Sequence, residues 1–179
     1  MDVTPLINAV IAREGGYVNN SADSGGATNF GITQTVARAQ GYAGNMRDLP
    51  RSEAVNIYTC LYWLKPCLNL IGDHSPKLAE KMFGIGVNMG PAIAIGFLKR
   101  ALNVLNRNGV DYANISTAPL VDATTTNALM AFIAKRGSAA EGVLIKSINA
   151  LQGERYISLA EARPADEAFV YGCLKNRIG

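Results

Sequence analysis

The stretch that decides the fold is EGGYVNNSADSGGATNFGIT at residues 14–33, where helical periodicity stops and small polar residues take over. Ahead of it, Thr4-Pro5 marks a helix start, and apolar residues then recur at helical spacing. Gly15-Gly16 ends this helix, because glycine accepts the left-handed backbone that a helix C-terminus needs. Residues 17–32 lack any periodicity, so we expect an irregular loop or a small hairpin there.

Helical signals dominate the remainder of the chain. Apolar spacing and start signals predict further helices over 33–40, 51–64, 75–87, 90–106, 122–136, 138–162 and 165–178. Thr33 and Asp122 stand where N-caps belong, and Ser138 and Glu141 have the spacing of a capping box. The polar residues 107–119 form a turn-rich connection between two of these helices. The pattern predicts a mainly α protein of about seven to eight helices.

The composition describes a compact globular protein. The 179 residues fit one domain with a sizeable core, and 49% of them are hydrophobic while 17% are charged. A net charge of +3 from scattered Lys and Arg is not the pattern of a nucleic-acid arm, so we expect no nucleic-acid partner. Cys60, Cys67 and Cys173 lack metal-ligand spacing and are expected to be free buried thiols.

Neither a metal nor a cofactor is expected. His74 is the only histidine and stands beside a Ser-Pro helix start, which favours a surface loop residue over a catalytic base. The amino terminus has no basic segment followed by an apolar one, so no secretory signal is visible. The most apolar stretch, 84–98, contains Asn88 and a Gly-Pro pair and falls short of the roughly 18 apolar residues that a membrane span needs. We expect a monomer made in the cytoplasm without stable membrane insertion.

The irregular stretch also carries the candidate chemistry. Glu14 and Asp23 are nine residues apart, and glycosidic cleavage uses one carboxylic acid to protonate the leaving oxygen and a second group to handle water or positive charge. The negative end of the first helix should raise the pKa of Glu14, and burial against Tyr17 or a later helix would add to this. The simpler alternative is a solvated helix end for Glu14, with Asp23, Thr28 and Asn29 serving only to build turns.

Other polar and aromatic residues have two interpretations each. Tyr62 and Trp63 could form a sugar-stacking surface, although helical periodicity favours core packing for at least one of them. Asn88 lies in an otherwise apolar helical segment, where its amide needs partners. It could bind an N-acetyl or hydroxyl group of a substrate, or it could cap the helix end before Gly90-Pro91.

The whole of residues 14–33 resembles the motif of glycoside hydrolase family 108. The resemblance continues in residues 49–54, 57–58, 62–63 and 87–91, and more weakly in 121–122 and 169–178. Members of this family are N-acetylmuramidases, found as phage endolysins and as muramidases that assist secretion. The resemblance implies a lysozyme-like, mainly α single domain over 1–179, with a catalytic-motif half at 1–91 and a peptidoglycan-binding-type helical half at 92–179.

The resemblance also implies an activity and a site. The activity is hydrolysis of the β-1,4 bond between N-acetylmuramic acid and N-acetylglucosamine, with peptidoglycan strands as the partner. The family's catalytic glutamate corresponds to Glu14. The spacing is similar to that of phage lysozymes, which places a water-positioning or charge-stabilising role on Asp23 and a water-orienting role on Thr28. Substrate contacts are expected from Asn29, Tyr62, Trp63 and Asn88.

The chain departs from the family pattern at three places. Ser21 and Ser24 stand where prolines are usual, Gly84 follows Phe83 where an acid is usual, and Asp122 is followed by alanine instead of glycine. These departures keep open a second hypothesis, in which the protein binds the wall or assists secretion without catalysis. In either case the protein must reach the wall in the periplasm, through a holin-type pore or a dedicated secretion system.

Overall fold

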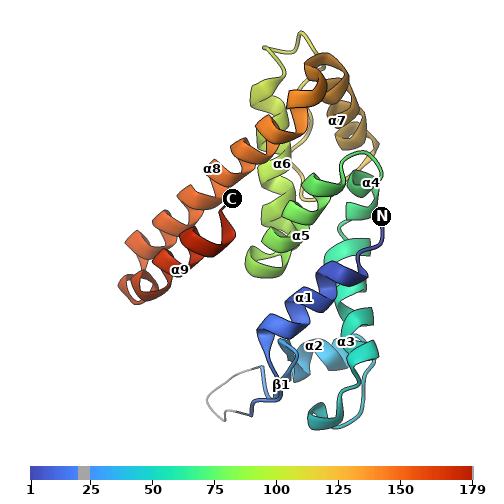
Figure 1. The fold of residues 1–179 in the computed structure, drawn as a ribbon, viewed down its shortest axis with the longest axis vertical. Helices are drawn as coiled ribbons and strands as arrows, with labels where there is room; N and C mark the ends of the chain where they lie inside the picture. The colour runs from blue at the N-terminus through green and yellow to red at the C-terminus, as the bar shows by residue number, and fades with distance from the viewer. Residues whose placement is uncertain (20–24, 179) are drawn as a thin grey trace. The chain divides into compact units, whose positions relative to one another are not determined.

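The computed structural model describes residues 1–19 and 25–178, so Asp23 lies outside the described residues (Figure 1). The chain divides into two compact units, unit 1 over Met1–Lys65 and unit 2 over Pro66–Gly179. Both are mainly helical, as the periodicity predicts. Residues 66–91, which the resemblance places in the catalytic-motif half, pack with the second unit.

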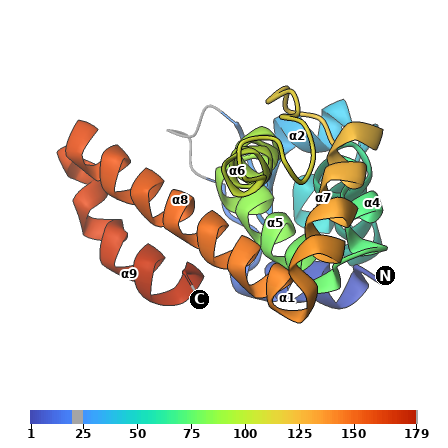
Figure 2. The ribbon, with the colours of Figure 1, turned by 90° about the horizontal axis from the view of Figure 1, so that it is seen from above.

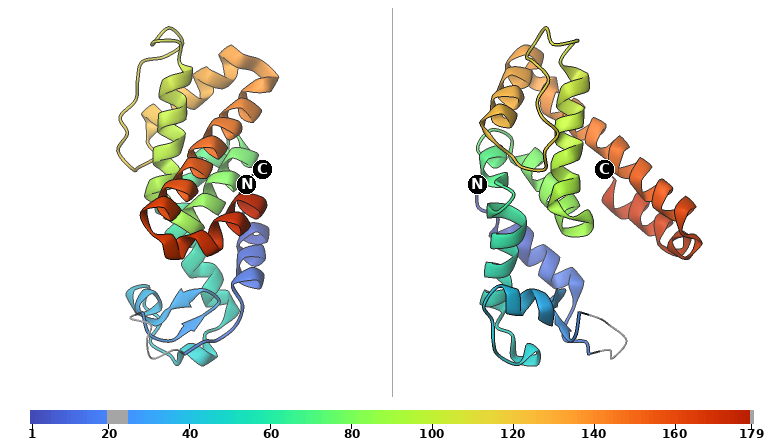
Figure 3. Two further views of the ribbon diagram at one scale, coloured as in Figure 1. Left: turned by 90° about the vertical axis from the view of Figure 1, so that its left-hand side faces the viewer. Right: turned by 180° about the vertical axis from the view of Figure 1, so that it is seen from behind.

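Unit 1 is built from α1 (Thr4–Glu14), a hairpin of β1 (Thr28–Asn29) and β2 (Ile32–Thr33), α2 (Gln34–Ala39), η1 (Met46–Asp48), α3 (Arg51–Tyr58) and η2 (Thr59–Leu64). Helices α1 and α3 contact each other, and their apolar faces, with Ile7, Val10 and Ile57, are buried. The left panel of Figure 3 shows the short hairpin. Of the two alternatives for residues 17–32, the structure therefore has the hairpin at its end.

The predicted helix over 51–64 is α-helical only in its first part. From Thr59 to Leu64 it widens into a π-helix, in which the Lys65 N–H donates to the Cys60 carbonyl at 2.9 Å. The hydroxyl of Thr59 donates back to the Val55 carbonyl at 2.8 Å, and such back-bonding bends a helix. Single π-turns often lie at functional sites.

Unit 2 contains α4 (Leu68–Gly72), α5 (Pro76–Met89), α6 (Pro91–Leu105), α7 (Ala123–Arg136), η3 (Gly137–Ala139), α8 (Ala140–Ala162), η4 (Pro164–Asp166) and α9 (Glu167–Arg177). Helices α5, α6 and α8 contact one another and bury large apolar side chains such as Phe83, Leu98 and Leu144. Helix α9 doubles back along the far end of α8 (Figure 2).

The caps of unit 2 differ in part from the prediction. Asp122 caps α7 as predicted, because its carboxylate accepts from the Thr125 N–H at 2.9 Å. The predicted capping box at Ser138 and Glu141 is wrong, since Ser138 lies in a 3₁₀ turn and α8 begins at Ala140 without a side-chain cap. Glu141 instead accepts a hydrogen bond of 2.6 Å from the Ser75 hydroxyl. Helix α4 was not predicted, because five residues are too few to show a period.

The described residues bear on membrane insertion and on metal binding. None of their helices combines the length and the apolar character that crossing a membrane requires. Within 1–19 and 25–178, no group of three or more His, Cys, Asp or Glu side chains is arranged to hold a metal ion.

Candidate functional site

Glu14 is the last residue of α1, and Gly15 ends the helix with a φ of 81°. The side chain of Glu14 is exposed, which corrects the expected burial against Tyr17 or a later helix. Tyr17 has a different neighbour, because the Arg47 guanidinium lies 4.6 Å from the centroid of its ring. An exposed carboxyl group is accessible to a large substrate.

The hairpin that follows is closed by a strained turn. Thr28 pairs with Thr33 and Asn29 with Ile32, leaving Phe30 and Gly31 as the two turn residues. Both have positive φ, 53° and 75°, as a type I′ turn requires. Phenylalanine is rare in this backbone region, since a bulky side chain is disfavoured there. Such strain persists only where neighbouring structure holds it, and it gathers at functional sites.

The turn packs directly on the side chain of Glu14. A Cβ built on Gly31 would lie 2.8 Å from the Tyr58 hydroxyl oxygen, and 3.0 and 3.1 Å from Cβ and Cγ of Glu14. No side chain fits at this position without moving a neighbour. Gly31 is therefore required by space as well as by its backbone conformation, and the turn, the acid and Tyr58 form one contact cluster.

Tyr58 and Tyr62 complete this cluster from α3 and η2. The buried Tyr58 hydroxyl donates to the Phe30 carbonyl at 3.1 Å, and the two tyrosine rings are 5.5 Å apart at 32°. Burial first, and then the negative charge of Glu14, raise the pKa of Tyr58. The same two causes raise the pKa of the half-buried Tyr62. Both phenols therefore stay protonated at neutral pH; Tyr58 donates its proton to the Phe30 carbonyl, and Tyr62 has its own proton to donate beside the acid.

Thr28 and Asn29 hold the hairpin in place. The backbone of Thr28 exchanges two hydrogen bonds of 2.8 Å with Val18, which ties the chain after Glu14 to the hairpin. Asn29 is buried, and its amide donates to the carbonyls of Met46 at 2.8 Å and Arg47 at 3.4 Å. These contacts give Asn29 a supporting role, and they do not favour the predicted contact with substrate.

Trp63 and Tyr62 differ in burial, and helical periodicity favours core packing for at least one of them. Trp63 is only 4% exposed and belongs to the core, which contradicts a sugar-stacking role for its indole. Tyr62 keeps part of its ring accessible and is the aromatic residue near the charge of Glu14.

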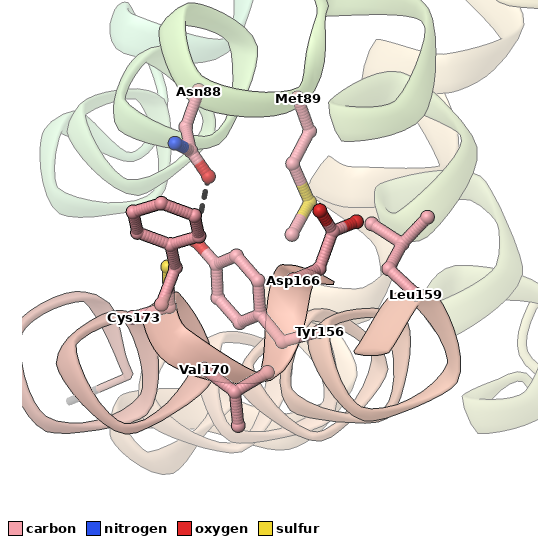
Figure 4. Close-up of a pocket in the computed structure, with 8 residues that line it drawn as sticks. Asn88, Met89, Tyr156, Leu159, Asp166, Val170 and Cys173 are labelled. Carbon is pink, nitrogen blue, oxygen red and sulfur yellow. Dashed lines mark hydrogen bonds between the residues drawn. The ribbon is translucent and has the colours of Figure 1, made fainter. Parts of the chain in front are cut away.

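Asn88 lies at the end of α5 in unit 2, where its side-chain oxygen accepts a hydrogen bond of 2.6 Å from the Tyr156 hydroxyl (Figure 4). Its amide does not cap α5, because the helix ends at Gly90 through a backbone bond to Gly86. Asn88 and Tyr156 line a mostly apolar pocket of about 250 Å³, together with Met89, Leu159, Asp166, Phe169, Val170 and Cys173. The position is thus part of unit 2, whose pocket walls come from α5, α8, η4 and α9.

The site resides in a recognisable domain. Residues 7–90 match the glycosyl hydrolase 108 family, and residues 93–178 match a family described as a predicted peptidoglycan domain. This chain carries a glycosyl hydrolase 108 domain. Its fold is similar to that of SagA from Brucella abortus, with a TM-score of 0.57 and 22% identity over 93% of this chain and 94% of that one. A comparison with curated protein sequences finds no significant match.

These matches confirm the resemblance and the lysozyme-like, mainly α fold. A glycosyl hydrolase 108 domain followed by a peptidoglycan domain implies hydrolysis of peptidoglycan. Glu14, the Phe30–Gly31 turn, Tyr58 and Tyr62 all lie within the glycosyl hydrolase 108 domain. Sequence reasoning did not single out Tyr58, although it stands four residues before Tyr62, a spacing that places both rings on one helix face.

Proposed function

We propose that the chain is an N-acetylmuramidase of the lysozyme type, in which Glu14 protonates the glycosidic oxygen between N-acetylmuramic acid and N-acetylglucosamine. The observation that carries this proposal is how the Glu14 side chain is placed in unit 1. Its carboxyl group is exposed, while its Cβ and Cγ pack beside the glycine of a strained turn. The proton donor is thus accessible to a polymer, yet it is attached to a fixed part of unit 1.

The surroundings of Glu14 support a role in sugar chemistry. Tyr62 presents a partly exposed ring beside the acid, and aromatic rings pack well on the apolar faces of sugars. A general acid works best when it is held within reach of the oxygen that it protonates. The turn at Gly31 provides such a hold, because it borders the first two carbons of the Glu14 side chain.

Two further roles belong to the same proposal. Asp23 would position the attacking water or stabilise positive charge, and Thr28 would orient that water. The backbone of Thr28 is fixed to Val18 on the segment that follows Glu14, so the threonine and the acid belong to one local structure. A carboxyl separation of about 5–5.5 Å would make the enzyme retaining, and one of about 6.5–9.5 Å would make it inverting.

The test compares Glu14→Gln with Glu53→Gln on purified peptidoglycan. Glu53 lies in α3 of the same unit, so the control makes an identical chemical change outside the proposed site. We expect wild type and Glu53→Gln to release soluble glycan fragments, and Glu14→Gln to release none while unfolding near the wild-type temperature. Full activity in a folded Glu14→Gln variant would refute the role of Glu14.

The peptidoglycan domain over residues 93–178 favours a second candidate, a wall-binding or secretion-accessory protein without catalysis. It predicts that wild type sediments with insoluble peptidoglycan but produces no clearing band in a zymogram. A clearing band that Glu14→Gln lacks excludes this candidate as the whole function. We further propose that the protein acts on the wall in the periplasm, after passage through a holin-type pore or a dedicated secretion system.

A further inference from the structure

The turn beside Glu14 needs an external support. Phe30 has a φ of 53°, in a region that is unfavourable for a bulky side chain, and the two strands of its hairpin pair at two positions, Thr28–Thr33 and Asn29–Ile32. The Phe30 carbonyl receives a hydrogen bond of 3.1 Å from Tyr58, a buried residue of α3. This bond joins the turn to a helix that is itself packed on α1.

The same hydroxyl also borders the space next to the acid. The point at which a Gly31 Cβ would lie is 2.8 Å from the Tyr58 oxygen and 3.0 Å from Cβ of Glu14. The Tyr58 hydroxyl and the base of the Glu14 side chain therefore contact the turn glycine from two sides. A turn released from Tyr58 could shift, and the Glu14 side chain would then lose the surface against which it rests.

The geometry points to Tyr58 as a positioning residue for the hydrolysis: its hydroxyl holds the Phe30–Gly31 turn against Glu14 and thereby fixes the conformation of the acid. This inference rests on the proposed role of Glu14. Tyr58 acts through the turn and is not itself the proton donor to substrate. Its buried phenol keeps its proton at neutral pH, because burial and the nearby carboxylate both raise its pKa, and that proton is available for the hydrogen bond to the Phe30 carbonyl.

The experiment measures kcat and KM of Tyr58→Phe on soluble peptidoglycan fragments, well below the unfolding temperature. The ring remains and only the hydroxyl is lost. Small misplacements of a catalytic group lower the rate strongly, so we expect kcat to fall about 10-fold or more with little change in KM. Tyr112→Phe is the matched control, because that hydroxyl donates to the Leu102 carbonyl at 2.8 Å in unit 2. Its loss should leave kcat unchanged.

Two additional measurements separate positioning from general stability. In the Glu14→Gln background, Tyr58→Phe should cause no further loss of rate in prolonged digests with excess protein, where any slow background release can be measured, since the group that it positions is already gone. In the nuclear magnetic resonance spectrum of Tyr58→Phe, the backbone signals of Glu14 and Gly31 should shift together. These signals report on the turn even for a variant that has no activity.

A wild-type kcat in Tyr58→Phe, or unmoved signals of Glu14 and Gly31, would overturn the positioning role and leave the proposed function intact. An equal loss of kcat in Tyr112→Phe would overturn it too, because the effect would then follow from any lost phenol hydrogen bond. Inactive wild-type protein contradicts the proposed function itself, and this outcome is distinguishable from the others because the control variants are equally inactive.

Discussion

Replacing Gly31 by alanine tests whether the hairpin turn packs on Glu14. The new methyl group would lie 2.8 Å from the Tyr58 oxygen and 3.0 Å from Cβ of Glu14, closer than carbon atoms normally approach either one. An L-residue in left-handed backbone costs about 1–2 kcal/mol, and overpacking costs about 1–3 kcal/mol. Gly31→Ala should therefore lower the free energy of unfolding of unit 1 by about 2–5 kcal/mol.

Gly41→Ala is the matched control for this variant. Gly41 has a φ of 95°, but nothing lies within 4 Å of its added Cβ, so only the backbone cost of about 1–2 kcal/mol applies. The protein's single tryptophan, Trp63, is buried in unit 1, and its fluorescence reports the unfolding of that unit in urea. Equal destabilisation by the two variants would refute the tight packing of Glu14, Gly31 and Tyr58. We also expect Gly31→Ala, but not Gly41→Ala, to lower the rate of peptidoglycan hydrolysis.

Two further variants test the supports of each unit. Asn29→Ala removes a buried amide that donates to the Met46 carbonyl, so it should destabilise unit 1 by about 1–3 kcal/mol in urea unfolding followed at Trp63; unchanged stability would show that the carbonyl needs no partner. Asp122→Ala removes the N-cap of α7 and should cost unit 2 about 1 kcal/mol at neutral pH. Hydrogen bonds from Thr125 hold the pKa of Asp122 below its usual value. The stability difference between wild type and Asp122→Ala should therefore be complete above about pH 4 and decline as the pH falls further. A melting-temperature difference that stays constant from pH 7 to about pH 2 would contradict this linkage.

Much of the helical architecture follows from local patterns. Thr33 and Asp122 cap the helices that the sequence places after them, and the Pro-initiated helices begin where expected. The errors occur where a tertiary partner decides the outcome. Glu141 has the spacing of a capping box, but its carboxylate accepts a hydrogen bond from the Ser75 hydroxyl instead. That contact joins positions 66 residues apart, and no local pattern contains it.

The candidate site shows the same limit. The motif at residues 14–33 is enough to propose Glu14 as the acid, because the helix end and the two glycines are local features. The support from Tyr58 depends on a contact across 28 positions, and the burial of Trp63 depends on packing that helical periodicity could assign to either aromatic residue of the pair. The left-handed Phe30 is also invisible to pattern reasoning, since phenylalanine is not a turn former.

We propose that the chain cleaves the bond after N-acetylmuramic acid with Glu14 as the acid. In the most direct measurement, the digestion products of purified peptidoglycan are reduced with borohydride and then hydrolysed. The reduced sugar is identified by mass spectrometry. Wild type is expected to give reduced muramic acid, and Glu14→Gln is expected to give none above background. Reduced glucosamine as the main product, or equal amounts of reduced muramic acid from the two proteins, would contradict the account.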